Sequence, residues 1–558
     1  MHKNNKTTVM AKLVTLFCLV YISCVNAEFQ SRKPLPIPPE DIKKVKPLVV
    51  PETTIFESRT LSSGVHVFIK RYKFIGNTVV SSDELANILH EFTGKRVMTS
   101  DLAQVRNLIT QAYIDRGYIN SGAVIPDQEV KEGVILVEIT EGVLTDIHLT
   151  GMDRLRDSYI LERISLDVGP PLNIGSLQKR LQLLHQDERI KTIKAELVPG
   201  SKRGEGYLNV DVMEAAPFTA SLEFSNHRSP SVGSDRLQLG FRHINVTGRG
   251  DTASVRIGNT SGLDDLGISY SLPITPEDMT IEIAYDRSNS GVVEEPFNLV
   301  DVNSKFESAR IFLNYPQIAD LNERLNYGFT VERRHSMTYL FGSPYSFSDG
   351  VNNGKSTVSA LRFSQDWTKR TKNTVWAVKS MFSFGLNAFG ATTNQTGPDG
   401  RFASWLGQFQ WVERMNKPFS RMIARLDTQL TNYRLLPLEK FVIGGVESVR
   451  GYRQNQLVRD NGLTASIEFR IPLLSEMSDT KKLELATYVD YGRAWDTSDS
   501  ATVPSNISSV GIGLLWKPAP VFDMELYFAK KLRNIDKGGV EYNLQDSGIH
   551  FMMRMKLF

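Results

Sequence analysis

Cysteine is almost absent from this sequence of 558 residues, which contains only Cys18 and Cys24. Both lie in an N-terminal stretch that starts with lysines, continues with a mostly apolar run over residues 13–22 and ends with small residues before Glu28. This pattern predicts a secretory signal peptide over residues 1–27, because the apolar run is too short to span a membrane as a helix. An exported mature chain without any thiol needs no disulfide framework.

Long hydrophobic runs are missing as well, since no later run approaches the roughly 18 apolar residues of a membrane-spanning helix. A membrane protein with this sequence would therefore have to be a β-barrel.

An excess of one charge is also missing. Loss of residues 1–27 removes three lysines and no carboxylate, so Lys and Arg fall from 65 to 62 and equal the 62 Asp and Glu. From this balance we expect no nucleic-acid partner.

Enzyme signatures are missing too. The sequence has no Gly-x-Ser-x-Gly elbow, no His-Glu-x-x-His motif and no cysteine pair for a metal. Residues 350–356 resemble a phosphate-binding loop, but three residues separate the glycines where the motif needs four, and no helix follows. We expect no catalytic residue, no metal and no cofactor, and we interpret residues 350–356 as a turn between strands.

Proline is concentrated between residues 31 and 52, where it alternates with Lys and Glu. Such a composition cannot build a core and favours an extended, solvated segment. We predict a linker over residues 28–64, and the sequence leaves open whether it includes a plug helix.

An α+β unit is predicted twice in succession, over residues 65–142 and 143–215. Each copy has the order strand, helix, helix, strand, strand, read from alternating and helical spacing of apolar residues. In the first copy, Ser81 or Ser82 is expected to cap the first helix, and Thr99 or Ser100 the second.

Residues 216–558 lose the helical period and alternate between apolar and polar side chains. One segment has four apolar residues on one face and three polar residues on the other: Ala465, Ile467, Phe469 and Ile471 against Ser466, Glu468 and Arg470. This two-residue period is typical of a wall between lipid and a watery lumen. At ~10 residues per membrane strand plus connections, about 16 antiparallel strands fit into the segment.

A glycine-rich turn inside this region carries one arginine. Gly444 and Gly445 precede Val449-Arg450-Gly451-Tyr452, and Asp490 lies on the polar face of a later strand. We therefore expect Asp490 to point into the lumen, where an arginine from a folded-in loop could meet it.

The first α+β copy resembles POTRA domains, the periplasmic polypeptide-binding modules. The resemblance rests on three stretches of the sequence: residues 74–78, Tyr113 to Tyr118, and residues 125–133, which include Gln128. It implies that the modules bind an extended segment at a strand edge, with Tyr118 and Gln128 as candidate contacts.

The whole chain resembles the TpsB outer-membrane transporters of two-partner (type V) secretion, the ShlB/FhaC/HecB-like haemolysin secretion/activation group. The most specific match is Val449-Arg450-Gly451-Tyr452. Tyr488-Val489-Asp490 matches the group's aspartate motif, in which phenylalanine is more usual at the first position. The resemblance implies a Gram-negative outer-membrane pore that exports a specific large TpsA-type exoprotein in extended form.

By the same resemblance, five residues anchor a lumenal loop and two form its hinge: Val449, Arg450, Gly451, Tyr452 and Asp490, with Gly444 and Gly445. Outer-membrane lipid and the barrel-assembly machinery are further expected partners. Whether the exoprotein is a haemolysin, an adhesin, a contact-dependent toxin or a haem-binding protein stays open.

Two other functions are compatible with parts of the sequence. A barrel insertase of the same superfamily would usually carry more POTRA copies and lack the proline-rich segment. A passive porin would have no evident use for two POTRA domains.

Overall fold

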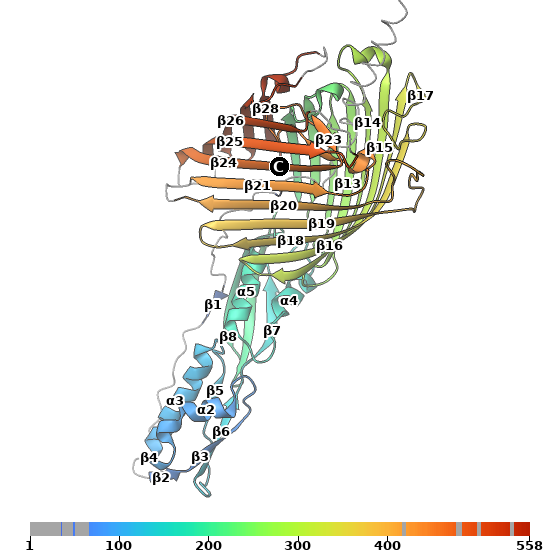
Figure 1. The fold of residues 1–558 in the computed structure, drawn as a ribbon. Coiled ribbons are helices and arrows are strands. Elements are labelled where there is room, and N and C mark those ends of the chain that lie inside the picture. The colour runs from blue at the N-terminus through green and yellow to red at the C-terminus, as the bar shows by residue number, and fades with distance from the viewer. Residues whose placement is uncertain are drawn as a thin grey trace, which may run out of the picture. The chain divides into compact units, whose positions relative to one another are not determined.

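The structure, a computed structural model, describes Leu35 and residues 48–50, 66–415, 420–475, 482–498, 504–535 and 541–558. The predicted signal peptide and most of the predicted linker lie outside these residues. The chain divides into two compact units, one that includes residues 41–216 and one that includes residues 251–558 (Figure 1).

The first half of the N-terminal unit is a small sheet covered by helices. Its elements are β2 (His66–Ile69), β3 (Arg71–Ile75), α2 (Ser82–Ile88), η2 (His90–Phe92), β4 (Lys95–Met98), α3 (Thr99–Asp115), β5 (Gly122–Val124) and β6 (Val134–Thr140). Strand β6 lies between β3, to which it runs parallel, and the antiparallel β5. Apolar residues of both helices, such as Leu85 and Ile109, are fully buried against Ile135 and Val137 of β6.

Two local details decide where these helices begin. Ser81 caps α2 by accepting a hydrogen bond from the Glu84 amide at 3.2 Å, as expected. The expectation for α3 was wrong, because its N-cap is Met98, whose amide donates to the Asp101 carboxylate at 2.8 Å. The strand β4, which pairs with β2, was not expected from the sequence.

The second half repeats the order with β7 (Val143–Thr150), α4 (Asp157–Ser165), α5 (Ile174–His185), β8 (Ile190–Pro199) and β9 (Glu205–Glu214). The sheet order is β1-β8-β9-β7, where β1 (Leu48–Val49) belongs to the proline-rich segment. Leu48 lies opposite Ala195 and Val49 opposite Glu196, so β1 extends the sheet in parallel at the β8 edge.

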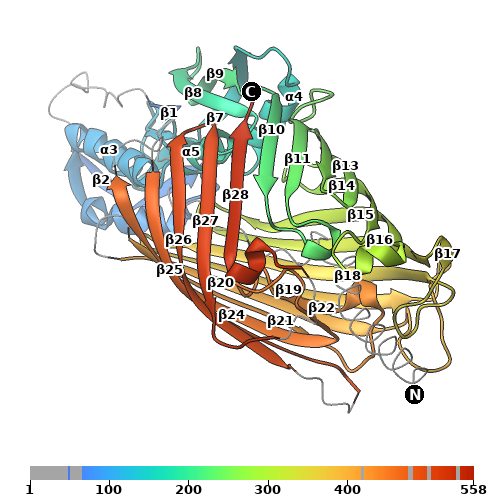
Figure 2. The same ribbon diagram turned by 90° about the horizontal axis from the view of Figure 1, so that it is seen from above.

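The second unit is a closed antiparallel barrel, and the prediction of about 16 strands is confirmed. Its sixteen long strands within the described residues are β10 (Phe218–Ser225), β11 (Arg236–His243), β12 (Thr252–Asn259), β13 (Leu263–Pro273), β14 (Thr280–Gly291), β15 (Val302–Ala319), β16 (Glu323–Leu340), β18 (Lys355–Arg370), β19 (Thr374–Leu386), β20 (Ala403–Arg414), β21 (Arg421–Leu430), β24 (Asn461–Ser475), β25 (Lys482–Trp495), β26 (Asn506–Ala519), β27 (Phe522–Lys531) and β28 (Ile549–Lys556). The two-residue β17 (Ser343–Pro344) only extends the end of β16. Pairing of β10 with β28, from Ser221 opposite Lys556 to Ser225 opposite Met552, closes the ring (Figure 2).

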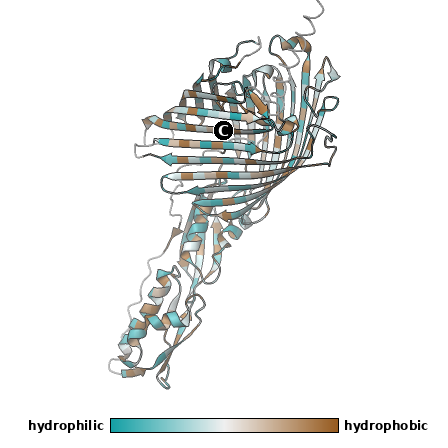
Figure 3. Ribbon diagram, in the orientation of Figure 1, coloured by the Kyte–Doolittle hydropathy of each residue, from teal (hydrophilic) through white to brown (hydrophobic). Residues whose placement is uncertain are grey.

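The two faces of the wall differ as the alternation predicts. Ile467 and Val489 are 50% and 55% exposed on the outer face, whereas their neighbours Glu468 and Asp490 are 3% and 0% exposed on the inner face. Hydrophobic and hydrophilic residues accordingly alternate along the strands (Figure 3). Burying charge inside and exposing apolar side chains outside is stable only where the outside is hydrocarbon. Within the described residues, no helix is both long and apolar enough to cross a membrane.

The segment between β21 and β24, residues 431–460, is named here the lumenal loop. It contains η5 (Pro437–Glu439), β22 (Phe441–Ile443) and β23 (Leu457–Arg459), and β22 and β23 pair as a short hairpin. We call residues 435–443 and 457–460 the base of the loop and residues 444–456 its tip. Residues 350–356, which resemble a phosphate-binding loop in sequence, lie in the connection from β17 to β18 and in the start of β18.

Candidate functional site in the barrel lumen

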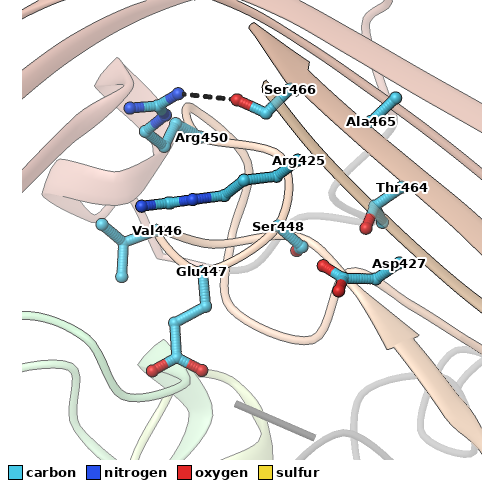
Figure 4. A pocket seen from close by; sticks show the side chains of 9 residues that line it. All are labelled: Arg425, Asp427, Val446, Glu447, Ser448, Arg450, Thr464, Ala465 and Ser466. Carbon is cyan, nitrogen blue, oxygen red and sulfur yellow. Dashed lines mark hydrogen bonds between the residues drawn. The ribbon is translucent and has the colours of Figure 1, made fainter. Parts of the chain in front are cut away.

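Arg450, in the tip, forms a two-pronged ion pair with Asp490 of β25. Its Nε lies 2.8 Å from Asp490 Oδ2 and its Nη2 lies 2.8 Å from Oδ1, while its backbone amide donates to Oδ2 at 3.0 Å. Ser466 of β24 donates from its hydroxyl to Asp490 Oδ1 at 2.7 Å and lies 3.2 Å from Arg450 Nη2 (Figure 4). Both charged side chains are almost fully buried. This planar, charge-assisted pairing fixes the position and the orientation of the tip.

Glu468 of β24 is a second carboxylate partner that sequence reasoning did not assign to the site. It accepts from Arg450 Nη1 and also from Arg470 Nε, the latter at 2.5 Å. The site therefore holds two arginines and two carboxylates, so the buried charges balance. Glu468 lies on the polar face that the sequence showed, but nothing in the sequence selected it from its polar neighbours on that face.

The Arg450 guanidinium also stacks on an aromatic ring. Its Cζ atom lies 3.4 Å from the centre of the Tyr488 ring and 5.1 Å from that of Tyr527. The two rings meet edge to face, with centroids 5.8 Å apart. The aromatic residue before Asp490 thus covers the flat face of the cation while the carboxylates bind its edge.

The two residues after Arg450 bind other strands. The Gly451 amide donates to His550 Nε2 of β28 at 2.9 Å, and a Cβ at position 451 would lie 2.6 Å from the Cβ of Ala529. The backbone at position 451 can lie this close to β27 because glycine has no side chain. Tyr452 is 1% exposed, and its hydroxyl lies 2.9 Å from the Ser508 carbonyl oxygen and 2.8 Å from that of Arg533.

Arg453 extends the contacts of the tip beyond the predicted motif. Its Nε and Nη2 bind Asp546 of η6 (Leu544–Ser547) at 2.8 and 2.7 Å, and its Nη1 binds Glu294 at 2.7 Å. These partners lie 93 and 159 residues away in the chain. No local sequence signal links them to Arg453.

The predicted hinge residues have backbone conformations that only glycine adopts easily. The φ angles of Gly444 and Gly445 are 115° and 94°. Gly444 donates its amide to the Ser448 hydroxyl at 2.8 Å, which closes the turn into the tip. Val449 is fully buried among Ile443, Phe441 and other apolar residues of the lumen.

A small pocket adjoins the site, with room for about 10 Å³, close to the size of one water molecule. Figure 4 shows the side chains of the tip and of β21 and β24 that surround it: Arg425, Asp427, Val446, Glu447, Ser448, Arg450, Thr464, Ala465 and Ser466. Within the described residues no three His, Cys, Asp or Glu side chains form a metal-binding group.

The two candidate contacts of the first α+β module belong to the other compact unit. Tyr118 packs against the module core, with its ring 6.1 Å from that of Tyr113. Gln128 binds the backbone of Leu136 in both directions at 2.8 Å, so its amide acts like a strand residue beside β6. A role for either in binding a polypeptide stays a prediction.

The fold and the site define a class: an outer-membrane barrel with α+β modules before it and a charged loop clamped inside it. Residues 204–515 match the family described as haemolysin secretion/activation protein ShlB/FhaC/HecB, and residues 67–142 match the ShlB-type POTRA domain. The chain therefore belongs to the ShlB/FhaC/HecB family of two-partner secretion transporters.

Individual relatives agree. The heme/hemopexin transporter protein HuxB of Haemophilus influenzae is 22% identical over 535 residues, which cover 88% of this chain and 90% of HuxB. The outer membrane transporter CdiB of Escherichia coli is 23% identical over 412 residues, 71% of this chain and 67% of CdiB. The solved structure of CdiB from Escherichia coli has the same fold, with a TM-score of 0.69 over 90% of this chain and 93% of that one, at 18% identity.

These matches place the barrel in the outer membrane and the POTRA modules in the periplasm. The chain is a protein-secreting transporter, and the family match favours this function over the insertase alternative.

Proposed function

We propose that the chain exports one large exoprotein partner of the TpsA type in extended form, and that release of Arg450 from Asp490 opens its path. The observation that carries this proposal is the set of contacts around Arg450, here called the clamp: the carboxylates of Asp490 and Glu468 and the ring of Tyr488. Through these contacts the lumenal loop is held inside the lumen of the barrel. An exported chain can pass only when that loop moves.

The clamp holds the loop firmly in the closed pore, but bonds within the wall reduce the energetic cost of its release. Removing one partner of a buried ion pair leaves an unpaired charge, at a cost of ~3–5 kcal/mol. When Arg450 leaves, Asp490 keeps its bond from Ser466, and Glu468 keeps its bond from Arg470. The wall therefore stays partly satisfied while the tip is displaced, which lowers the cost of opening.

The POTRA modules receive the exoprotein at a sheet edge. The β8 edge already accepts an extended segment, since β1 pairs with it in parallel. Leu48 packs against the core of the second module, while Val49 is 63% exposed. This geometry, one apolar side chain inserted and the next exposed, supports capture of an extended polypeptide by strand addition. Tyr118 and Gln128 are the proposed contacts in the first module.

The chain acts as a pore and not as an enzyme, and its apolar outer face contacts outer-membrane lipid after insertion by the barrel-assembly machinery. The description of HuxB as a heme/hemopexin transporter protein supports a haem- or hemopexin-binding exoprotein as one candidate partner, beside haemolysins, adhesins and contact-dependent toxins.

The test is secretion from cells that carry this chain and a candidate neighbouring exoprotein, with wild type compared to Arg450→Ala and Asp490→Ala. Export should collapse in both variants although their channels open more readily, because a tip without its anchor has no defined closed position from which the exoprotein can displace it. The amount of folded barrel in the membrane should stay normal. If export is unchanged and other barrels fail to assemble, the insertase function replaces the proposal.

A further inference from the structure

A second group of buried charges lies on the other side of the lumenal loop. Glu439 of η5 is 1% exposed, and it faces two arginines and a glutamate from the wall. These are Glu332 and Arg334 of β16 and Arg362 of β18, exposed by 3%, 3% and 6%. Neither the sequence motifs nor the proposed function uses this group.

The geometry of this group mirrors the Arg450 site with the charges reversed. The Glu439 carboxylate accepts hydrogen bonds from Arg362 Nη2 at 2.9 Å and Nη1 at 3.1 Å, and from Arg334 Nη1 at 3.1 Å. Glu332 binds the same two arginines at 3.0 Å each. Here the loop supplies the carboxylate and the wall supplies the cations, and the four charges balance.

Backbone and apolar contacts add to the ion pairs. Arg334 also donates to the Leu438 carbonyl oxygen at 3.0 Å, and Gln429 donates to the Glu439 carbonyl oxygen at 3.0 Å. Three leucines of the base are buried in one cluster with residues of the wall: Leu435, Leu436 and Leu438 with Phe306, Val358, Ala360 and Phe402. The base of the loop is therefore packed against β15, β16, β18 and Phe402, which precedes β20.

The two limbs of the base are also tied to each other. Asp460 accepts the Leu435 amide at 3.0 Å and pairs with Lys440 at 3.2 Å. Lys440 reaches Asp496, at the β25 end of the wall, at 3.0 Å. Together with the hairpin of β22 and β23, these bonds make the base one rigid piece.

The tip differs from the base in its backbone more than in its exposure. Every residue of the base is buried or half-buried, and so is every residue of the tip except Glu447, which is exposed. The glycine pair Gly444 and Gly445 lies at the junction of the two parts. Strands β19, β20 and β21 separate the Glu439 contacts on β18 from the Arg450 contacts on β24.

We infer that Glu439 is the positioning residue of a permanent second anchor, so that the base stays on the wall and only the tip, residues 444–456, swings about Gly444 and Gly445 when the pore opens. This inference rests on the proposed function, because it assumes that the lumenal loop is what blocks the pore. It divides the lumenal loop into a fixed part and a moving part, a division that does not follow from the Arg450 motif alone.

A pair of engineered disulfides tests the division directly, and both share one cysteine. An ideal Cβ at Gly492 of β25 would lie 2.6 Å from Ile443 Cγ2 in the base and 2.9 Å from Val449 Cγ2 in the tip. One C–C bond separates each Cγ2 from its Cβ, so both pairs fall within the about 4.5 Å that a disulfide spans between Cβ atoms. Outside the predicted signal peptide the chain has no other cysteine that could interfere.

We expect oxidised Ile443→Cys with Gly492→Cys, which ties the base, to export the exoprotein like its own reduced form. Oxidised Val449→Cys with Gly492→Cys, which ties the tip, should export nothing until a reductant is added. Gly492→Cys alone, in which Ile443 and Val449 have to shift to make room for the added side chain, is the control for the shared substitution. A base tie that blocks export, or a tip tie that permits it, overturns the inference.

Ion conductance of the purified protein in planar lipid bilayers gives a readout that does not depend on the exoprotein. The tip tie should abolish channel opening in a reductant-sensitive way, and the base tie should leave it unchanged. If wild type exports no candidate exoprotein but shows this conductance pattern, the proposed function fails and the inference stands. If wild type exports the exoprotein but the oxidised base tie blocks export, the inference fails and the proposed function stands.

Glu439 itself is tested against a matched control. Glu439→Gln and Glu332→Gln remove the same charge from the same buried group, but only the first removes an ion pair between the loop and the wall. We expect Glu439→Gln to raise the open fraction of the channel by at least about tenfold, because the loss of one partner of a buried ion pair is strongly destabilising. Glu332→Gln should stay close to wild type, and both barrels should be folded. Equal effects of the two variants would reduce Glu439 to a structural charge of the wall and overturn its positioning role.

Discussion

The Arg450 guanidinium lies flat against the Tyr488 ring, with its Cζ 3.4 Å from the ring centre. The tyrosine hydroxyl points elsewhere, to the Phe528 carbonyl oxygen at a long 3.3 Å. The ring therefore contributes its face, and the hydroxyl contributes little. This explains how a tyrosine can fill a position where the resemblance to the family's aspartate motif implies a phenylalanine.

The first prediction follows from this stacking. Tyr488→Phe should export the exoprotein at close to the wild-type rate, because the ring face is retained. Tyr488→Ala should weaken the closed state by about 2 kcal/mol, the value of a desolvated cation–π contact, and so increase spontaneous channel opening. Bilayer conductance measures the effect, and equal behaviour of the two variants would contradict it.

The second prediction concerns the coupling of Arg450 and Asp490. Each single alanine variant leaves a buried charge without its main partner, whereas the double variant removes both charges. The double variant should therefore be less destabilised than the sum of the singles, with a coupling of ~2 kcal/mol or more between the two positions. Urea-induced loss of the folded barrel in detergent gives the four free energies, and additive values would contradict a direct pair.

Much of the architecture could be predicted because it follows from local periodicity. The alternation around Ile467 and Val489 requires lipid on one side, and the repeated strand-helix-helix-strand-strand order requires two small modules. The partners inside the lumen could not be predicted in this way. Arg362 and Glu439 are 77 residues apart, and Arg453 and Glu294 are 159 residues apart. Their meeting depends on how the loop crosses the barrel, which no short pattern encodes.

The misses at smaller scale have a similar cause. Strand β4 has only four residues, and its pairing with β2 decides its conformation more than its own composition does. The N-cap of α3 is Met98 because Asp101 reaches back to its amide, so a side chain three residues into the helix supplies the cap. Polar residues such as Glu468 were placed on the correct face, but a face does not identify a partner.

The third prediction concerns Glu468, which binds two arginines at once. Glu468→Gln should leave Arg450 bound to Asp490 but remove the link to Arg470, so the tip should be weakened without being released. We expect export to persist and channel opening to increase by less than in Asp490→Ala. An effect as large as that of Asp490→Ala would show that Glu468 is the main anchor instead.

The last prediction is a pH dependence in the first POTRA module. Glu141, just after β6, accepts the Thr78 amide at 2.6 Å, the Val79 amide at 3.1 Å and the Tyr113 hydroxyl at 2.9 Å. Burial alone would raise the pKa of Glu141, but these hydrogen bonds and that of the Thr78 hydroxyl outweigh it and hold the pKa below its usual value. The carboxylate thereby ties the turn after β3 to the end of β6.

A carboxyl whose pKa is lower in the folded state stabilises that state above its unfolded pKa of about 4.3, and this contribution is lost as the pH falls through the folded value. We expect of the order of 1 kcal/mol at neutral pH, since the group is partly exposed and solvent screens it. The full-length protein in detergent should show this as a lower urea midpoint of the helical circular-dichroism signal at pH 3.5 than at pH 7.

Glu141→Gln should already have the lower midpoint at pH 7, and its difference from wild type should close as the pH falls. Asp127→Asn removes an exposed carboxylate of the same module and is the matched control. It should follow wild type at both pH values, because Asp127 lies at the surface of the module. A constant gap between Glu141→Gln and wild type across the range would mean that the carboxylate acts through packing and not through its charge.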